Sequence, residues 1–314
     1  MRFSRFAISA AAVLATTSLA AAADPASCKT VRFSDVGWID ITATTAATSL
    51  VLQGLGYTAK TDVLAVPVTY TSMKNKNIDV FLGNWMPTME ADRKPYVDDK
   101  SVDVVGVNLE GAKYTLAVPA YTYEAGLKTF ADIAKFQTQL AGKVYGIEPG
   151  NDGNRLILDM IKDNKFDVKG FELVESSEQG MLAQVERATR RKEPILFLGW
   201  EPHPMNTKYQ IKYLAGGDDI FGPDLGGATI YTNTRAGYTT ECPNVGQLLK
   251  NLKFTLQMEN EIMGSILFDK QEADKAAGDW LKANPAVLEG WLKGVTTFDG
   301  KPGLPAVKTA LGVK

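Results

Sequence analysis

The chain has 314 residues, of which 45% are hydrophobic and 22% charged, and its formal net charge is −2. This composition is typical of a globular protein and excludes a disordered chain, and the absence of a basic excess predicts no nucleic-acid partner. The length is sufficient for two compact domains.

The chain begins with the layout of a secretory signal peptide, residues 1–23. Arg2 and Arg5 form a positive start, residues 7–19 form an apolar stretch too short to span a bilayer well, and three alanines before Asp24 offer a cleavage site. An uncleaved membrane anchor is the alternative, but no stop-transfer pattern follows. We expect a mature chain that starts at Asp24 and is periplasmic and soluble.

Export makes the two cysteines, Cys28 and Cys242, informative. They form the only available pair, and an oxidising compartment favours a disulfide between them. Two buried free thiols are the alternative. A disulfide would place the start of the mature chain and the region around residue 242 in the same lobe.

Short apolar strands alternate with helical stretches through the mature chain. Residues 41–53 predict a helix with Asp40 as its N-cap and with Gly54 and Gly56 at its end. The other predicted elements are strands at 31–33, 78–82, 102–107, 114–118, 144–147, 195–198, 211–214 and 228–231, and helices at 127–136, 154–162 and from 245 to 293. This alternation predicts an α/β architecture with mainly parallel sheets.

Two segments of the chain resemble each other. Residues 81–87 read FLGNWMP and residues 197–202 read FLGWEP, so each is an apolar strand followed by Gly, Trp and Pro. The match predicts two similar α/β halves, although a chance match of so short a segment stays open. We predict that lobe one comprises 24–112 and 225–314, that lobe two comprises 113–224, and that crossing strands join them around a ligand cleft.

Three of the five tryptophans, Trp38, Trp85 and Trp200, follow predicted strand ends, and Tyr114 opens a strand after the first crossing. Ligands bind beyond the carboxyl ends of the strands in open α/β sheets, so these rings lie where a ligand is expected. Several aromatic faces around one point bind a cation that cannot donate hydrogen bonds, at roughly 0.5–2 kcal/mol per ring. The alternative is that the rings pack the interface between the lobes.

Two polar residues add to this candidate site. Asp40 could bring a negative charge to the cation and accept a hydrogen bond from a ligand hydroxyl, besides capping its helix. The loop 148–154, EPGNDGN, leads into a helix start where amides bind polar groups, and Asn151 could add a side-chain contact. Trp280 and Trp291, eleven residues apart, are interpreted as packing of the C-terminal helices.

Several short motifs together resemble a known family. They are Trp38-Ile39-Asp40, FLGNWMP at 81–87, Tyr114, GIEPG at 146–150, GWEP at 199–202, and Trp280-Leu281 with Asn284-Pro285. The sequence resembles the substrate-binding proteins of ABC importers for quaternary ammonium compounds, in the glycine betaine group, and most of all its periplasmic choline-binding members. The resemblance covers essentially the whole mature chain. It implies a two-lobed periplasmic-binding-protein fold of type II that delivers its ligand to a permease driven by an ATPase.

The resemblance also implies roles for particular residues. In choline-binding members an aromatic box surrounds the trimethylammonium group, and the matching positions here are Trp38, Trp85, Tyr114 and Trp200. Asp40 and Asn151 match an acidic and a polar contact at the other end of choline, and Cys28 and Cys242 match a disulfide of this subgroup. We expect no cofactor, no metal site, no catalytic residue and a monomeric protein.

Asp40 bears on which ligand fits. It would repel the carboxylate of a betaine, whereas the hydroxyl of choline can donate a hydrogen bond to it. We therefore expect choline, with acetylcholine as a weaker ligand, and a binder of glycine betaine, proline betaine or carnitine as the alternative. A secreted hydrolase is the alternative of a different class, but His203 is the only histidine and no nucleophile motif accompanies it.

Overall fold

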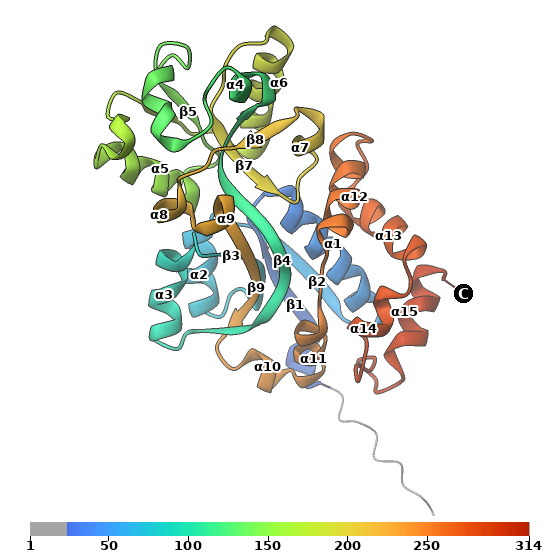
Figure 1. Ribbon diagram of the computed structural model, residues 1–314. Coiled ribbons are helices and arrows are strands. Elements are labelled where there is room, and N and C mark those ends of the chain that lie inside the picture. The colour runs from blue at the N-terminus through green and yellow to red at the C-terminus, as the bar shows by residue number, and fades with distance from the viewer. Residues whose placement is uncertain (1–23, 314) are drawn as a thin grey trace, which may run out of the picture.

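The computed structural model describes residues 24–313, which form two lobes joined by long strands (Figure 1). The predicted signal peptide, residues 1–23, lies outside the described residues. Within residues 24–313, no helix combines the length and the apolar character needed to cross a membrane.

The first lobe is built on a small parallel sheet. Strand β1 (Thr30–Asp35) lies between β2 (Thr58–Val63) and β3 (Val80–Met86) and pairs in parallel with both. The helices along this part of the chain are η1 (Ala26–Cys28), α1 (Ile39–Gly54), α2 (Val66–Lys74) and α3 (Glu90–Asp98). The predicted helix at 41–53 is confirmed as α1, which begins two residues earlier.

The second lobe repeats this plan with shorter strands. Strand β5 (Lys143–Tyr145) pairs in parallel with β6 (Glu172–Val174) and with β7 (Phe197–Glu201). Its other elements are β8 (Ile211–Tyr213), α4 (Ala120–Glu124), η2 (Phe130–Phe136), α5 (Asp152–Lys162), η3 (Lys165–Asp167), α6 (Glu178–Arg191), α7 (Met205–Lys208), α8 (Asp218–Phe221) and α9 (Pro223–Gly226).

Two antiparallel strands connect the lobes. Strand β4 (Val102–Pro119) pairs with β9 (Gly227–Arg235) along its first part and with β7 and β8 along its last part, while β9 also pairs with β3. The sheet order is β2-β1-β3-β9-β4-β7-β5-β6, with β8 beside β4. Figure 1 shows β4 running from the lower lobe into the upper one.

The crossing strands correct two predictions. The sheets were predicted to be mainly parallel, but every pairing of β4 and β9 is antiparallel. The reason is that β4 runs from the first lobe to the second and β9 runs back from the second to the first. The separate strands predicted at 102–107 and 114–118 are one strand, which is bent by three register shifts. The predicted lobe boundaries at 112–113 and 224–225 fall within β4 and just before β9, and they stay a prediction.

The two similar segments occupy equivalent places in the lobes. The segment at 81–87 forms most of β3, and the one at 197–202 forms β7 and the residue after it. In both, the glycine is closely packed: a Cβ on Gly83 would lie 2.7 Å from Ile41 Cδ1, and a Cβ on Gly199 would lie 2.7 Å from Ala117 Cβ. The two segments therefore have the same local role in the two lobes.

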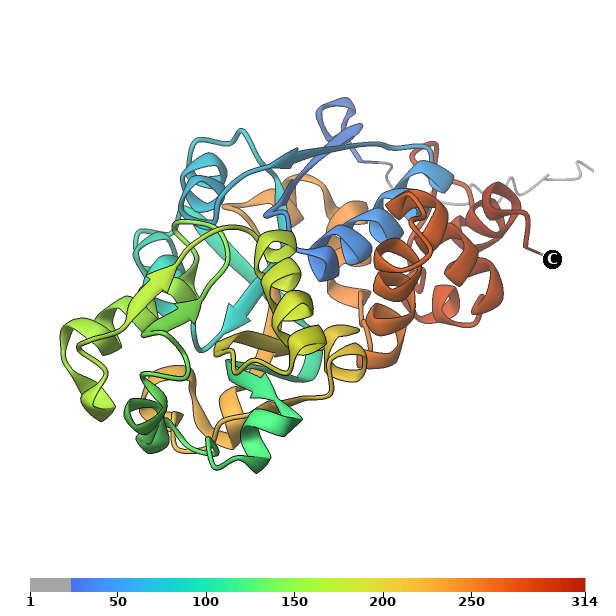
Figure 2. The ribbon, with the colours of Figure 1, turned by 90° about the horizontal axis from the view of Figure 1, so that it is seen from above.

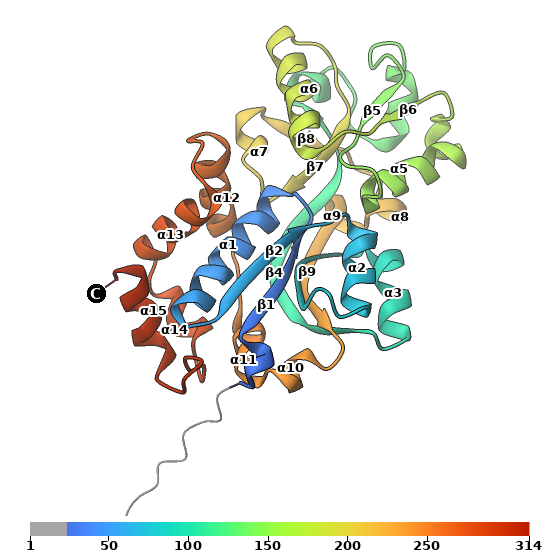
Figure 3. The same ribbon diagram turned by 180° about the vertical axis from the view of Figure 1, so that it is seen from behind.

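Helices at the end of the chain cover α1. They are α10 (Tyr238–Glu241), α11 (Pro243–Asn251), α12 (Leu256–Leu267), α13 (Ala273–Ala283), α14 (Val287–Trp291) and α15 (Gly303–Leu311). Helix α1 packs against α12, α13 and α15, as the rear view in Figure 3 shows. Trp291 is buried and its indole N–H donates to the Lys253 carbonyl, so the packing role predicted for Trp291 is confirmed.

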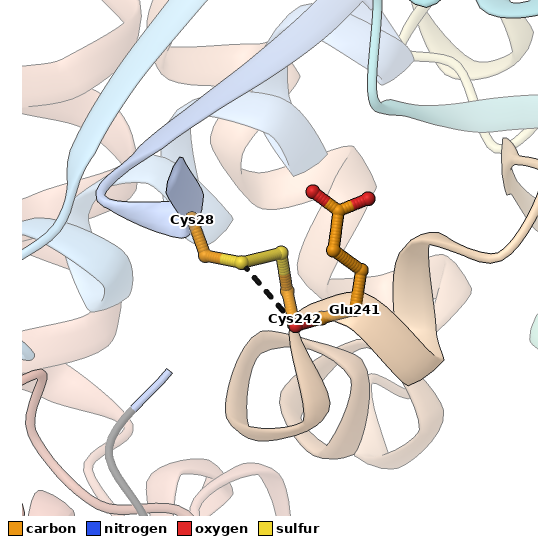
Figure 4. A group of neighbouring side chains, drawn as sticks. All are labelled: Cys28, Glu241 and Cys242. Atoms are coloured by element: carbon orange, nitrogen blue, oxygen red, sulfur yellow. Dashed lines mark hydrogen bonds between the residues drawn. A yellow bond between two sulfur atoms is a disulfide. The ribbon is translucent and has the colours of Figure 1, made fainter. Parts of the chain in front are cut away.

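The predicted disulfide between Cys28 and Cys242 is present, and both residues are buried (Figure 4). It links η1 to the start of α11 across 214 residues of chain. Glu241 lies beside it, but its carboxylate pairs with Arg235 at 2.8 Å. Sulfur atoms in a disulfide are not thiolates and do not ligate metals, so the two cysteines form a covalent link between chain segments and these three residues form no metal site.

Candidate ligand-binding site

A cavity of about 270 Å³ lies where the two lobes meet. It is lined by four aromatic residues, two carboxylates and one aliphatic residue, namely Trp38, Trp85, Tyr114, Trp200, Asp40, Asp152 and Ile147. All seven are buried, none with more than 6% of its surface exposed, so the lobes are closed over the cavity.

Three of the rings come from strands of the sheet, with β9 lying between β3 and β4. Trp85 lies on β3, Tyr114 on β4 and Trp200 on β7. Tyr114 stands between the other two, with ring centroids 6.0 Å from Trp85 and 6.3 Å from Trp200 and interplanar angles of 61° and 78°. Rings set at such angles around a cavity form separate walls instead of one stack, which is the arrangement that surrounds a cation.

The register of the sheet explains this gathering. Tyr114 pairs directly with Trp200 across β4 and β7, while Trp85 pairs with Ile230 on β9, the strand on the other side of β4. The sequence pattern predicts Trp85 and Trp200 after their strands and Tyr114 at a strand start. These positions are wrong by a few residues: Trp85 and Trp200 are the next-to-last residues of β3 and β7, and Tyr114 lies inside β4.

The fourth ring, Trp38, comes from the segment before α1. Its indole N–H donates to the Glu148 carboxylate of the other lobe at 2.9 Å, which fixes the ring against the cavity. Trp38 is the N-cap residue of α1, and Asp40 lies in the first turn of that helix. The prediction that Asp40 caps α1 is therefore wrong, since the helix begins one residue before Asp40, whose side chain lines the cavity instead.

Two carboxylates face the cavity, each at a helix N-terminus. Asp40 lies in the first turn of α1, and Asp152 is the first residue of α5. Each has a buried side-chain oxygen without a hydrogen-bond partner in the described structure, Oδ1 of Asp40 and Oδ2 of Asp152. Unpartnered buried acceptors are unusual in folded proteins, so these two atoms can accept a hydrogen bond from a ligand or attract its charge.

Burial raises the pKa of both carboxyl groups. The pKa of Asp40 rises to about 8, because the group is desolvated and the Glu178 carboxylate lies nearby. Burial likewise raises the pKa of Asp152 to about 6 and that of Glu148, which holds Trp38, to about 7. A ligand cation would reverse this effect, because a positive charge favours the ionised form of each carboxyl group.

Asn151 does not line the cavity. Its side-chain oxygen accepts from Asn154 N at 3.1 Å, which caps α5, and from the Tyr114 hydroxyl at 2.8 Å. Gly153 permits this approach, since a Cβ there would lie 2.1 Å from the Tyr114 hydroxyl oxygen. Asn151 therefore holds the Tyr114 ring in place, and its predicted contact with the ligand stays a prediction.

Five of the six residues that the sequence analysis named for the site line one cavity, and two further lining residues were missed. Ile147 ends an apolar run and carries no signal of its own. Asp152 follows Asn151 in the EPGNDGN loop, and the sequence does not reveal which of the two side chains caps α5 and which faces the cavity.

The fold and this cavity define a two-lobed substrate-binding protein. The family model described as the substrate binding domain of ABC-type glycine betaine transport systems matches residues 29–283. The chain belongs to this family.

Solved structures and a curated relative agree with this assignment. The chain is similar to an ABC-transporter choline binding protein solved in complex with choline, with 66% identity, a TM-score of 0.91, and coverage of 92% of this chain and all of that one. It is also similar to lactococcal OpuAC in a closed form with glycine betaine, with 26% identity, a TM-score of 0.76, and coverage of 83% and 98%. The glycine betaine/carnitine transport binding protein GbuC of Listeria monocytogenes is 30% identical over 162 residues, 52% of this chain and 53% of that protein.

Proposed function

We propose that this protein binds choline in the periplasm and delivers it to an ABC permease. The observation that carries the proposal is the composition of the cavity: four aromatic rings and two carboxylates, with no Lys or Arg among the described residues that line it. A trimethylammonium group cannot donate hydrogen bonds, and aromatic faces attract it at roughly 0.5–2 kcal/mol per ring. The 66% identity to a protein solved with choline supports the same ligand.

The two carboxylates favour choline over betaines. The choline hydroxyl can donate to an unpartnered oxygen of Asp40 or Asp152, whereas the carboxylate of glycine betaine would be buried against two acidic groups. Acetylcholine has no hydroxyl to donate and is bulkier, so we expect it to bind more weakly. A betaine or carnitine binder is the second candidate, favoured by the family description and by the likeness to the Listeria monocytogenes relative.

A transport role also suits the state of the only histidine. His203 is buried, its Nδ1 accepts from Met205 N at 2.9 Å, and its Nε2 lies 3.1 Å from the Glu178 carboxylate. Neither ring nitrogen is free to activate a nucleophile, which counts against a hydrolase. We propose that residues 1–23 are removed on export, and that the mature protein acts as a monomer with a permease and its ATPase as partners.

The test is calorimetric titration of the mature protein, stripped of ligand, with choline and glycine betaine in parallel. We expect one-to-one binding of choline and at least tenfold weaker binding of glycine betaine. Equal or tighter binding of glycine betaine would replace choline with the second candidate. Binding of neither would contradict the proposed function and leave the rings as packing between the lobes.

A further inference from the structure

Helix α1 receives its N-terminal cap from the opposite lobe. Its own N-cap residue, Trp38, makes no side-chain capping hydrogen bond. The N–H of Ile39, the first residue of the helix, donates instead to Glu178 Oε2 at 3.0 Å, although Glu178 lies 139 residues further along the chain. Glu178 is the first residue of α6, which Figure 3 shows in the lobe above α1.

The other carboxylate oxygen of Glu178 is held within its own lobe. Oε1 of Glu178 lies 3.1 Å from His203 Nε2, and both side chains are buried. Because Nδ1 of His203 accepts from Met205 N at 2.9 Å, the ring proton is on Nε2 and is donated to Glu178. The two carboxylate oxygens of Glu178 thus accept hydrogen bonds from different lobes. Oε1 accepts from His203 in its own lobe, and Oε2 accepts from Ile39 N–H in the opposite lobe.

These contacts join residues of the cavity on both sides. Ile39 lies between Trp38 and Asp40, which both line the cavity. The His203 ring is 5.0 Å from the ring of Trp200, which lines the cavity from the second lobe. The view from above in Figure 2 shows α6, in yellow-green, beside the start of α1, in blue.

We propose that Glu178 is a positioning residue for ligand capture: it caps α1 only when the lobes close, and so fixes Trp38 and Asp40 against the ligand. This inference rests on the proposed function. A carboxylate at a helix N-terminus is stabilised by the exposed N–H groups and the helix dipole, so the contact favours the closed form. When the lobes separate, the Ile39 N–H donates to water instead, and Glu178 retains only its hydrogen bond with His203.

Other contacts also join the lobes. Trp38 donates its indole N–H to Glu148, and Arg155 on α5 pairs with Asp92 at 2.8 Å and donates to the Thr88 carbonyl at 3.3 Å. These contacts involve side chains that can reorient. The Glu178 contact is made to the backbone between two lining residues, so its loss displaces both of them together.

The test compares Glu178→Gln and Glu178→Ala with Glu186→Gln, a control on the same helix whose carboxylate is 42% exposed and pairs with Lys208. The amide of Glu178→Gln offers one acceptor to two donors, Ile39 N–H and His203 Nε2–H, so one of the two contacts is lost. We expect the choline dissociation rate, measured by stopped-flow tryptophan fluorescence, to rise about tenfold in Glu178→Gln and further in Glu178→Ala. In both Glu178 variants, the association rate and the midpoint of thermal unfolding without ligand should stay close to their wild-type values. Glu186→Gln should match wild type in all of these measurements.

Dissociation rates within twofold of wild type in both Glu178 variants would overturn the inference. So would weaker binding that is matched by a lower unfolding midpoint of the ligand-free protein, because Glu178 would then only support the fold. A wild-type protein that does not bind choline would contradict the proposed function and not the cap. In that case, small-angle scattering of the ligand-free wild type and of Glu178→Ala tests the cap. A more open Glu178→Ala variant would support the inference, and a scattering profile equal to that of wild type would overturn it.

Discussion

The cavity has two kinds of wall, which differ in how they are built and in how they respond to pH. The aromatic wall of Trp85, Tyr114 and Trp200 is borne by three strands and carries no group that titrates near neutral pH. The acidic wall of Asp40 and Asp152 lies at two helix N-termini, and burial raises the pKa of both groups. We therefore propose that the aromatic wall supplies affinity for any quaternary ammonium group and that the acidic wall selects among such ligands.

Removing one ring should give the largest loss of binding. We expect Trp200→Ala to weaken choline and glycine betaine alike, by about 100-fold, because it removes one cation–π contact and opens the closed cavity to water. The measurement is calorimetric titration with both ligands. Trp280→Ala is the control, since Trp280 lies on α13 away from the cavity and bonds to Glu261, and it should bind like wild type. A loss below tenfold for Trp200→Ala would contradict the role of the aromatic wall.

Neutralising the acidic wall should change selectivity more than total affinity. We expect Asp40→Asn to weaken choline about tenfold and to strengthen glycine betaine, because the amide removes the attraction for the cation and the repulsion of the carboxylate together. Asp152→Asn should act in the same direction, which tests the lining residue that the sequence analysis missed. If the ratio of the two dissociation constants stays at its wild-type value in both variants, the acidic wall does not select the ligand.

The acidic wall should also make choline binding depend on pH. Since the pKa of Asp40 is raised to about 8 without ligand, this group is protonated at neutral pH and must release its proton to face the cation in its ionised form. Affinity should therefore rise between pH 6 and pH 8, by up to about tenfold per pH unit, and level off above pH 8. Titration in buffers of different ionisation enthalpy measures the proton release. An affinity that is flat over this range, or equally steep in Asp40→Asn, would contradict the assignment.

The disulfide should have the smallest effect on binding. Because Cys28 lies in η1, Cys242 lies at the start of α11 and neither lines the cavity, we expect Cys28→Ser with Cys242→Ser to change choline affinity less than twofold. The same variant should lose about 2–5 kcal/mol of unfolding free energy, as expected for a disulfide that closes a long loop. Denaturant unfolding and titration of one preparation separate the two effects. A tenfold loss of affinity would show that this region and the cavity are coupled.

The sequence predicted the rings of the cavity better than the polar groups. The rule that ligands lie beyond strand ends located Trp38, Trp85 and Trp200, because a large aromatic residue at such a position is conspicuous. The same reasoning named Asp40 for the site but also made it the cap of α1, and it missed Asp152, because capping and cavity-facing positions differ by only one or two residues along a helix start. The cap that Glu178 gives to α1 joins residues 139 positions apart, and no local pattern predicts such a contact.

The sequence predicted the individual helices and strands better than it predicted β4 and β9, the strands that connect the lobes. The strands predicted at 102–107 and 114–118 both belong to β4, where register shifts let one strand bend and continue through Gly111. Such a strand resembles two short ones in sequence, because glycine marks both turns and bulges. Only pairing with β9 on one side and β7 on the other makes it continuous.

The most direct test of the central claim compares choline with 3,3-dimethyl-1-butanol, its neutral isostere, in which a carbon replaces the quaternary nitrogen. Both have the same shape and the same hydroxyl, so they differ in charge alone. Titration of the wild-type protein should show at least about 100-fold weaker binding of the isostere, because it loses the attraction of four rings and two carboxylates. Binding within tenfold of choline would contradict the account, since the cavity would then select shape and not a cation.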